Sequence, residues 1–352
     1  MFIDPRGKAF AHLDRLSSWQ AGRKPAPVTV EWDLTNVCSL ACQSCHMAHT
    51  HVAGPWAGKA ARGASYGDTG RMAAVSTVER GLGEMAASGV QAIVWSGGGE
   101  PTLHPAFASI VQCAASFGLE QGLYTLGGHV TEALARTVGP LLSWVVISLD
   151  APDAETYAAE KGVSVQRFED ACAGVVRLTG ECPVVGVSFL LHAGNWRRTA
   201  AMLALARSLG ATYATFRPTV TVSQAQPDTL VGDRAWVTEA LPTLEALAHE
   251  ADVEIDVQRF VQFRDWTGHG YDTCYGVRLL TQVTPDGRVW ICPNRRGIAG
   301  SELGNLTDDS FPSIWAKHPG QWTDFRDCRA MCRLHLVNTT LATVYRPRQH
   351  EA

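Results

Sequence analysis

The sequence predicts an α/β protein: a partial (β/α)6 barrel followed by a small cysteine-bearing α+β domain. Two observations support this fold class. Short apolar, β-rich runs alternate with helical patterns six times, and the alternation stops after about Thr219. Six units are too few for a closed eight-fold barrel, so we expect an open barrel with functional loops at the strand C-terminal ends.

The repeating part begins at Val28. Its six strands are expected at Val28–Leu34, Gln91–Ser96, Gly122–Thr125, Trp144–Leu149, Val184–Leu191 and Ala214–Arg217. Helices are expected between them at Thr77–Ala87, Ala106–Phe117, Thr131–Val138, Val165–Leu178 and Thr199–Leu209. Ser76 and Glu79 have the spacing of a capping box, which predicts the start of the first helix.

The rest of the chain does not follow this alternation of strands and helices. A helix near Asp233–Glu250 and a strand at Val253–Gln258 lead into a segment with a hairpin turn signal at Pro285-Asp286-Gly287. We expect an N-terminal extension at 1–26, the barrel at 27–220 with a long insertion at 47–75, a connection at 221–258, the second domain at 259–340 and a tail at 341–352. Insertions of this length are usually lids, binding loops or disordered segments.

Composition narrows the class of protein. The chain has 352 residues, 46% hydrophobic and 18% charged, with no apolar stretch long enough for a bilayer and no signal peptide at Met1–Lys8. These features predict a soluble cytoplasmic protein without a membrane partner. A net charge of −4 gives no general nucleic-acid footprint, although Lys317–Arg348 carries six cations and two anions. Seven of the ten cysteines fall into two groups, which in a reducing compartment favours metal binding over disulfides.

The first cysteine group directly follows the first strand. Cys38, Cys42 and Cys45 form a CxxxCxxC loop. Three thiolates on one short loop can converge on a metal centre and leave one coordination position open, and soft thiolates suit iron–sulfur clusters. The alternative is a zinc loop that takes its fourth ligand from a nearby histidine: His46, His49 or His51.

A second motif follows the second strand. Gly97, Gly98, Gly99, Glu100 and Pro101 form a glycine run that allows close approach of a ligand and ends in an anionic side chain. Together with the cysteine loop, this GGEP motif resembles the radical S-adenosylmethionine (SAM) superfamily over roughly residues 28–218. The resemblance implies a radical SAM barrel.

The resemblance also implies cofactors. Cys38, Cys42 and Cys45 would hold a [4Fe–4S] cluster whose open iron takes the amino and carboxylate groups of SAM. The glycine run with Glu100 would bind the methionyl ammonium. Polar SAM contacts are expected at three strand ends: Ser148, Asn195 and Arg217. Such an enzyme takes electrons from a flavodoxin- or ferredoxin-type partner and cleaves SAM to a 5′-deoxyadenosyl radical, which abstracts hydrogen from the substrate.

Two departures from the family pattern affect the adenine contacts. Ser44 stands where the family usually has an aromatic residue, and Leu126-Gly127-Gly128 replaces the usual Asn-Gly after the third strand.

The second cysteine group comprises Cys274, Cys292, Cys328 and Cys332. It resembles the auxiliary [4Fe–4S] domain of radical SAM enzymes, in the short "twitch" form of the SPASM type. Its last pair has CxxxC spacing where CxxC is usual, which makes Cys332 the least regular ligand. Four thiolates would close the site, favouring electron transfer or structural support; a zinc ribbon is the alternative.

The sequence restricts the substrate only loosely. His46 and His49 lie beside the expected radical site and are candidate acid–base groups. We expect oxidation or isomerisation of a polar sugar, nucleoside or amino-acid-like group. The alternatives are isomerisation of a glycinyl-modified thymine base in phage DNA, peptide modification, and a non-catalytic iron–sulfur or zinc protein. The peptide reading is disfavoured here because the 26 residues before the barrel are too short for a leader-recognition domain.

Overall fold

The computed structural model describes residues 8–42, 45, 71–221, 229–325 and 328–345. The strands are β1 (Thr29–Asp33), β2 (Ala92–Ser96), β3 (Glu120–Thr125), β4 (Trp144–Ser148), β5 (Val185–Leu191), β6 (Tyr213–Pro218), β7 (Val253–Ile255), β8 (Leu280–Val283), β9 (Arg288–Trp290) and β10 (Glu302–Asn305). The α-helices are α1 (Leu13–Gln20), α2 (Val75–Ala87), α3 (Phe107–Ser116), α4 (Glu132–Val138), α5 (Ala154–Lys161), α6 (Gln166–Thr179), α7 (Thr199–Ser208), α8 (Trp236–Leu247), α9 (Val257–Arg264), α10 (Phe311–Ala316) and α11 (His335–Val344).

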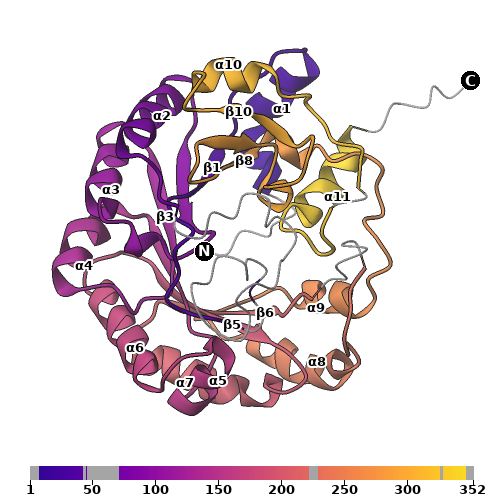
Figure 1. Ribbon diagram of the computed structural model, residues 1–352. Coiled ribbons are helices and arrows are strands. Elements are labelled where there is room, and N and C mark those ends of the chain that lie inside the picture. Colours follow the sequence, from indigo (N-terminus) through magenta and orange to yellow (C-terminus); the bar gives the residue numbers. More distant parts are fainter. Residues whose placement is uncertain (1–7, 43–44, 46–70, 222–228, 326–327, 346–352) are drawn as a thin grey trace, which may run out of the picture.

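The strands form one sheet in the order β10-β9-β8-β1-β2-β3-β4-β5-β6-β7. Strands β1 to β7 are parallel neighbours, each connected to the next through helical segments. Figure 1 shows the helices as an outer ring around the curved sheet. The predicted partial (β/α)6 barrel is therefore confirmed, and β7 extends it by one parallel strand.

Packing on the two faces of the sheet follows side-chain size. On the face toward the helices, Trp32 of β1 and Trp95 of β2 are buried, and a Cβ on Gly81 of α2 would lie 2.8 Å from the Trp32 ring. On the opposite face, Gly122 of β3 leaves room for the Trp144 ring, which a Cβ would meet at 2.1 Å. Small residues thus let large rings fill both sides of a strongly curved sheet.

The C-terminal segment continues the barrel sheet. Strand β8 pairs in parallel with β1, from Thr29 opposite Leu280 to Trp32 opposite Val283. The predicted turn at residues 285–287 is confirmed, because β8 and β9 form an antiparallel hairpin in which Gly287 has φ of 81°. In Figure 1 this hairpin lies beside β1, opposite the arc of α4 to α7. The second cysteine group is thereby attached directly to the first barrel strand.

Three local predictions differ from the structure. The capping box at Ser76 is wrong: α2 starts at Val75, and Ala74 precedes it without a side-chain cap. Just before the helix, the Ala73 N–H donates to the Leu34 carbonyl at 2.9 Å. The strand expected to reach residue 258 ends at Ile255, since the Asp256 carboxylate caps α9. Helix α5 was not predicted, because its sequence is polar and buries little apolar surface.

Candidate functional site

The two motifs meet at the C-terminal ends of β1 and β2. In the parallel pairing of these strands, Asp33 lies opposite Ser96. Beyond the strand ends, the Gly99 N–H donates to the Thr35 carbonyl at 2.9 Å and the Glu100 N–H donates to the Val37 carbonyl at 2.8 Å. A Cβ on Gly99 would lie 2.0 Å from the Val37 carbonyl oxygen, so only glycine fits this crossing. The glycine turn is thus locked against the start of the cysteine loop.

The cysteine loop gathers its thiols at the same rim. The pKa of Cys38 is raised to about 12, mainly by burial and also by the nearby charges of Cys42, Glu100 and Cys45, all of which favour the neutral thiol. Buried thiolates that repel one another in this way become stable beside a cation, which is the environment a metal cluster supplies. In the described part of the chain, no three His, Cys, Asp or Glu side chains stand at metal-binding spacing. Ligation by the three cysteines therefore stays a prediction, which their donor chemistry fits.

Glu100 is held at this rim by hydrogen bonds from the protein itself. Its buried carboxylate accepts hydrogen bonds from the Thr102 N–H at 3.1 Å and the Thr102 hydroxyl at 2.5 Å. It also accepts from the Thr125 hydroxyl at 2.6 Å and the Leu126 N–H at 2.8 Å, both at the end of β3. Four donors from the protein itself make Glu100 a bridge between the glycine turn and the loop after β3. A direct contact of its carboxylate with SAM stays a prediction.

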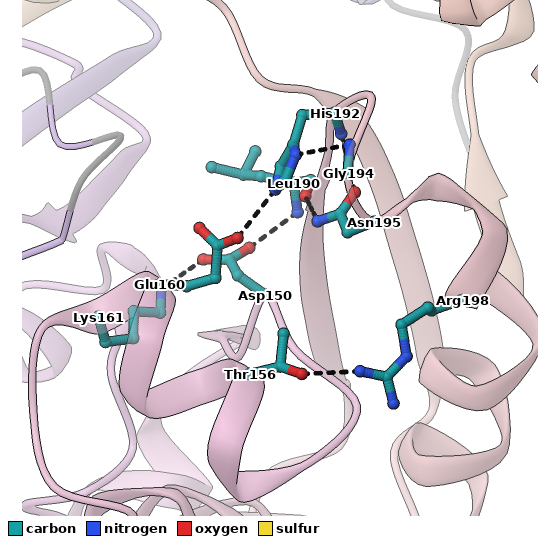
Figure 2. Close-up of polar contacts among 9 residues, drawn as sticks. All are labelled: Asp150, Thr156, Glu160, Lys161, Leu190, His192, Gly194, Asn195 and Arg198. Carbon is teal, nitrogen blue, oxygen red and sulfur yellow. Dashed lines mark hydrogen bonds and ion pairs between the residues drawn. The ribbon is translucent and has the colours of Figure 1, made fainter.

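A second polar network lies after β4 and β5 (Figure 2). Asp150, whose φ is 61°, forms a buried ion pair with Lys161 and accepts the Leu190 N–H at 2.8 Å. Burial lowers the pKa of Lys161, but the charges of Asp150 and Cys42 outweigh this and raise it overall. Burial raises the pKa of Cys42, and the ammonium of Lys161 opposes part of this rise. The end of α5 thus provides a buried cation beside one thiol of the first cysteine group.

Asn195 belongs to this network through its own loop. Its side-chain oxygen accepts the His192 N–H at 2.8 Å, and its amide nitrogen donates to the Leu190 carbonyl at 2.9 Å. His192 also contacts Glu160 at 2.9 Å (Figure 2). Asn195 is buried and holds the turn after β5. Its predicted contact with SAM stays a prediction.

The other two residues predicted to contact SAM from strand ends lie at the expected positions in the sheet. Ser148 is the last residue of β4 and is half-buried, and Arg217 lies near the end of β6. Burial lowers the pKa of Arg217, but interactions with Tyr124 and Glu254 raise it overall. These positions agree with the sequence reasoning, whereas their contacts with a cofactor stay predictions. His46 and His49 lie outside the described residues.

The second cysteine group surrounds one cavity. Its empty volume is about 380 Å³, part of it open to solvent, and all four cysteines line it: Cys274, Cys292, Cys328 and Cys332. The pKa of Cys292 is raised to about 12 and that of Cys332 to about 11, in both cases first by burial and then by the charge of Cys328. The irregular CxxxC spacing thus does not remove Cys332 from the group. A fourfold thiol donor set in one cavity fits a closed iron–sulfur or zinc site.

Sequence reasoning missed the buried cation beside this cavity. The Arg295 guanidinium lies over the Trp322 ring, 4.3 Å from its centroid, and donates to Ser301 Oγ at 2.7 Å. It also approaches Cys328 Sγ at 3.6 Å, where it would stabilise a thiolate. The available signal was the position of Arg295 three residues after Cys292.

No helix in the described residues is long and apolar enough to cross a membrane.

Two family models match the chain. One describes the radical SAM superfamily and matches residues 32–206; the other describes an iron–sulfur cluster-binding domain, SPASM, and matches residues 274–335. The sequence is 28% identical over 303 residues to the PqqA peptide cyclase of Methylorubrum populi, an alignment covering 84% of this chain and 73% of that protein. The corresponding enzyme of Methylorubrum extorquens is 29% identical with the same coverage.

Solved structures share the fold. SuiB of Streptococcus suis bound to S-adenosylmethionine superposes with a TM-score of 0.63 at 12% identity, covering 91% of this chain and 73% of that one. SuiB bound to its precursor peptide SuiA gives a TM-score of 0.62 at 11% identity, with 91% and 71% covered. The anSMEcpe protein with bound AdoMet gives 0.60 at 15% identity, with 82% and 80% covered.

Proposed function

We propose that this chain, which belongs to the radical SAM superfamily, uses radical chemistry to modify a peptide. The matched domains imply SAM, a SAM-binding [4Fe–4S] cluster and auxiliary iron–sulfur binding. The observation that supports a peptide substrate is the similarity to PqqA peptide cyclases along 84% of the chain. The same relatives lend no support to the sugar, nucleoside or modified-DNA substrates expected from the sequence, and favour the alternative that was disfavoured there.

The described residues supply binding and positioning. Cys38, Cys42 and Cys45 would hold the SAM-binding cluster, which when bound supplies the electron that cleaves SAM to a 5′-deoxyadenosyl radical. Glu100 holds the glycine turn at the rim through its four hydrogen bonds. Lys161 places a positive charge near Cys42. These groups fix the cofactor's surroundings before reaction, which is the main contribution a protein makes to such chemistry.

The auxiliary cysteines have a different role. Because four thiols surround one cavity, a cluster held there would have no position left for substrate. We therefore assign this site to electron transfer or structural support. A reductant of the flavodoxin or ferredoxin type would supply electrons from outside.

The experiment compares substrates on one preparation. Anaerobically reconstituted enzyme is incubated with SAM and dithionite alone, with short peptides encoded next to its gene, and with a panel of amino sugars and nucleosides. We expect 5′-deoxyadenosine formation in every reaction, and stimulation together with a hydrogen-loss mass change in one peptide. Stimulation by a sugar or nucleoside with every peptide unchanged would overturn the peptide assignment. Absence of 5′-deoxyadenosine throughout would overturn the radical reaction itself.

A further inference from the structure

Five arginines from separate parts of the chain gather at one place in the structure. They are Arg217 on β6, Arg259 on α9, Arg296 after β9, and Arg329 and Arg333 around the last cysteine pair. Arg329 donates to the carbonyl of Val220, which follows β6, and Arg259 donates to the carbonyl of Met331, which lies between Arg329 and Arg333 in the chain. Arg296 and Arg333 bind Asp33 and Glu31, two residues apart on β1. These contacts define one cluster of guanidinium groups, called here the arginine group.

The arginine group lies between the two cysteine sites. The charge of Arg329 is felt by Cys45 of the first group, and Arg329 also lines the cavity of the second group. Arg259 interacts with Cys332 of the second group. A substrate that reaches a radical formed at the first site would therefore lie near these guanidinium groups.

Two members of the group are paired with carboxylates of β1. Arg296 binds Asp33 at 2.8 Å, and Arg333 binds Glu31. Burial raises the pKa of both carboxyl groups, and the arginines oppose this. Within each pair the positive and negative charges therefore neutralise one another, and neither arginine has a free charge for a ligand.

Arg217 interacts with Tyr124 and Glu254, whereas Arg259 and Arg329 have less charge compensation. Arg329 donates to the Val220 carbonyl at 2.6 Å and Arg259 to the Met331 carbonyl at 2.7 Å. Among the described residues, neither guanidinium forms an ion pair with a carboxylate. Both side chains are half-buried, so each keeps part of its surface accessible. Like charges held together at partial burial are costly unless an anion joins them.

We propose that Arg259 and Arg329 of the arginine group bind a carboxylate of the peptide substrate and hold it between the two cysteine sites. The inference rests on the proposed peptide-modifying function and names the side-chain chemistry of its substrate. Guanidinium groups match a carboxylate through paired N–H donors, and several of them surrounding one anion give orientation as well as affinity. An aspartate, a glutamate or a chain-terminal carboxyl group would satisfy the site.

The test uses small probes on the reconstituted holoenzyme. N-acetylglutamate N-methylamide and its uncharged isostere N-acetylglutamine N-methylamide are titrated and followed by ligand-observed NMR. We expect the charged probe to bind at least about tenfold more tightly, as the loss of charged hydrogen bonds predicts. Thymidine 5′-monophosphate is titrated in parallel; tighter binding of this phosphate than of the carboxylate would overturn the assignment.

Substitutions then localise the binding. Arg329→Gln and Arg259→Gln are each expected to weaken the charged probe by about tenfold, with partial rescue in Arg329→Lys. The control is Arg197→Gln, an exposed arginine paired with Glu239 on the outer surface. Iron content and the EPR spectrum are recorded for every variant. Variants that alter the auxiliary EPR signal while probe affinity stays unchanged would show that the arginines serve the cluster, which overturns the proposal.

The radical reaction and the binding of a carboxylate are tested by separate measurements. Formation of 5′-deoxyadenosine by the wild-type preparation tests the radical reaction, and it does not involve the probes. If the radical forms and both probes bind equally or not at all, the carboxylate proposal is wrong while the radical chemistry stands.

Discussion

Replacing Gly99 by alanine tests whether the glycine turn and the cysteine loop form one unit. The new Cβ would lie 2.0 Å from the Val37 carbonyl oxygen and 2.7 Å from the Asn36 carbonyl carbon. The first distance is roughly 1.5 Å shorter than an unstrained nonbonded contact. Both neighbours are backbone, so no flexible side chain can move aside, and the turn must separate from the loop.

That separation has two consequences of different size. It breaks the hydrogen bonds from Gly99 to Thr35 and from Glu100 to Val37, each contributing about 1 kcal/mol, and overpacking of this kind costs about 1–3 kcal/mol. It also moves the rim where SAM is predicted to bind, and a displacement of about 1 Å at a reacting centre can cost about a hundredfold in rate. We therefore expect a modest loss of stability and a large loss of 5′-deoxyadenosine formation.

The assay measures both effects on the same protein. Urea unfolding of the apo-protein gives the change in stability, and anaerobic turnover gives 5′-deoxyadenosine per iron. The control is Gly180→Ala at the end of α6, where a Cβ would meet its nearest neighbour, the Arg177 carbonyl oxygen, at an ordinary 3.7 Å. A Gly99→Ala enzyme that keeps wild-type turnover would refute the reasoning, because the two motifs would then be independent.

Four further outcomes are expected. Cys38→Ala should abolish 5′-deoxyadenosine formation, and turnover in that variant would remove the primary cluster assignment. Cys292→Ala should lose about half of the bound iron, measured by iron analysis, and unchanged iron would show that the second cavity holds none. Lys161→Met should destabilise the apo-protein by about 3–5 kcal/mol in urea, because it leaves Asp150 buried without its cation; adding Asp150→Asn should restore part of this, and full stability of the single variant would contradict the pairing. Burial lowers the pKa of His318 from 6.5 to about 3, so the neutral ring contributes its full stabilisation above pH 6.5 and this stabilisation is lost as the pH falls toward 3. Between pH 6.5 and pH 5 the free energy of unfolding should therefore fall by up to about 2 kcal/mol. A His318→Phe variant whose unfolding free energy has the same pH slope would exclude this histidine.

The barrel was predictable because each strand carries its own signal. Apolar runs such as Gln91–Ser96 fall within a residue or two of the observed strands, since the hydrophobic pattern of a buried parallel strand is strong and local. Helix α5 lacked such a signal: only Tyr157 and Lys161 are fully buried, most of its other residues are half-buried, and tertiary contacts fix it. The pairing of β8 with β1 joins residues about 250 positions apart, and no local pattern encodes it.

The site divides in the same way. The glycine run and the cysteine spacings are short, contiguous motifs, so their residues could be identified and placed at strand ends. The charged partners could not, because the interaction of Lys161 with Cys42 and that of Arg333 with Glu31 depend on the folded chain. The basic excess near the C-terminus is partly explained by this: Arg329 donates to the Val220 carbonyl, and the exposed Arg333 reaches the buried carboxylate of Glu31.

Strand β1 sets the relation between the two cysteine sites. Its C-terminal end continues into the loop of the first group, and its edge pairs with β8, from which the hairpin leads to Cys292. Glu31 and Asp33, on alternate positions of the same strand, bind Arg333 and Arg296 from the C-terminal segment. Backbone pairing and two ion pairs thus fix the auxiliary site to the strand that carries the radical site. Because packed strands do not slide past one another easily, the sheet fixes the distance between the two cysteine sites. A substrate group held by the arginine group would therefore be fixed in position relative to both sites.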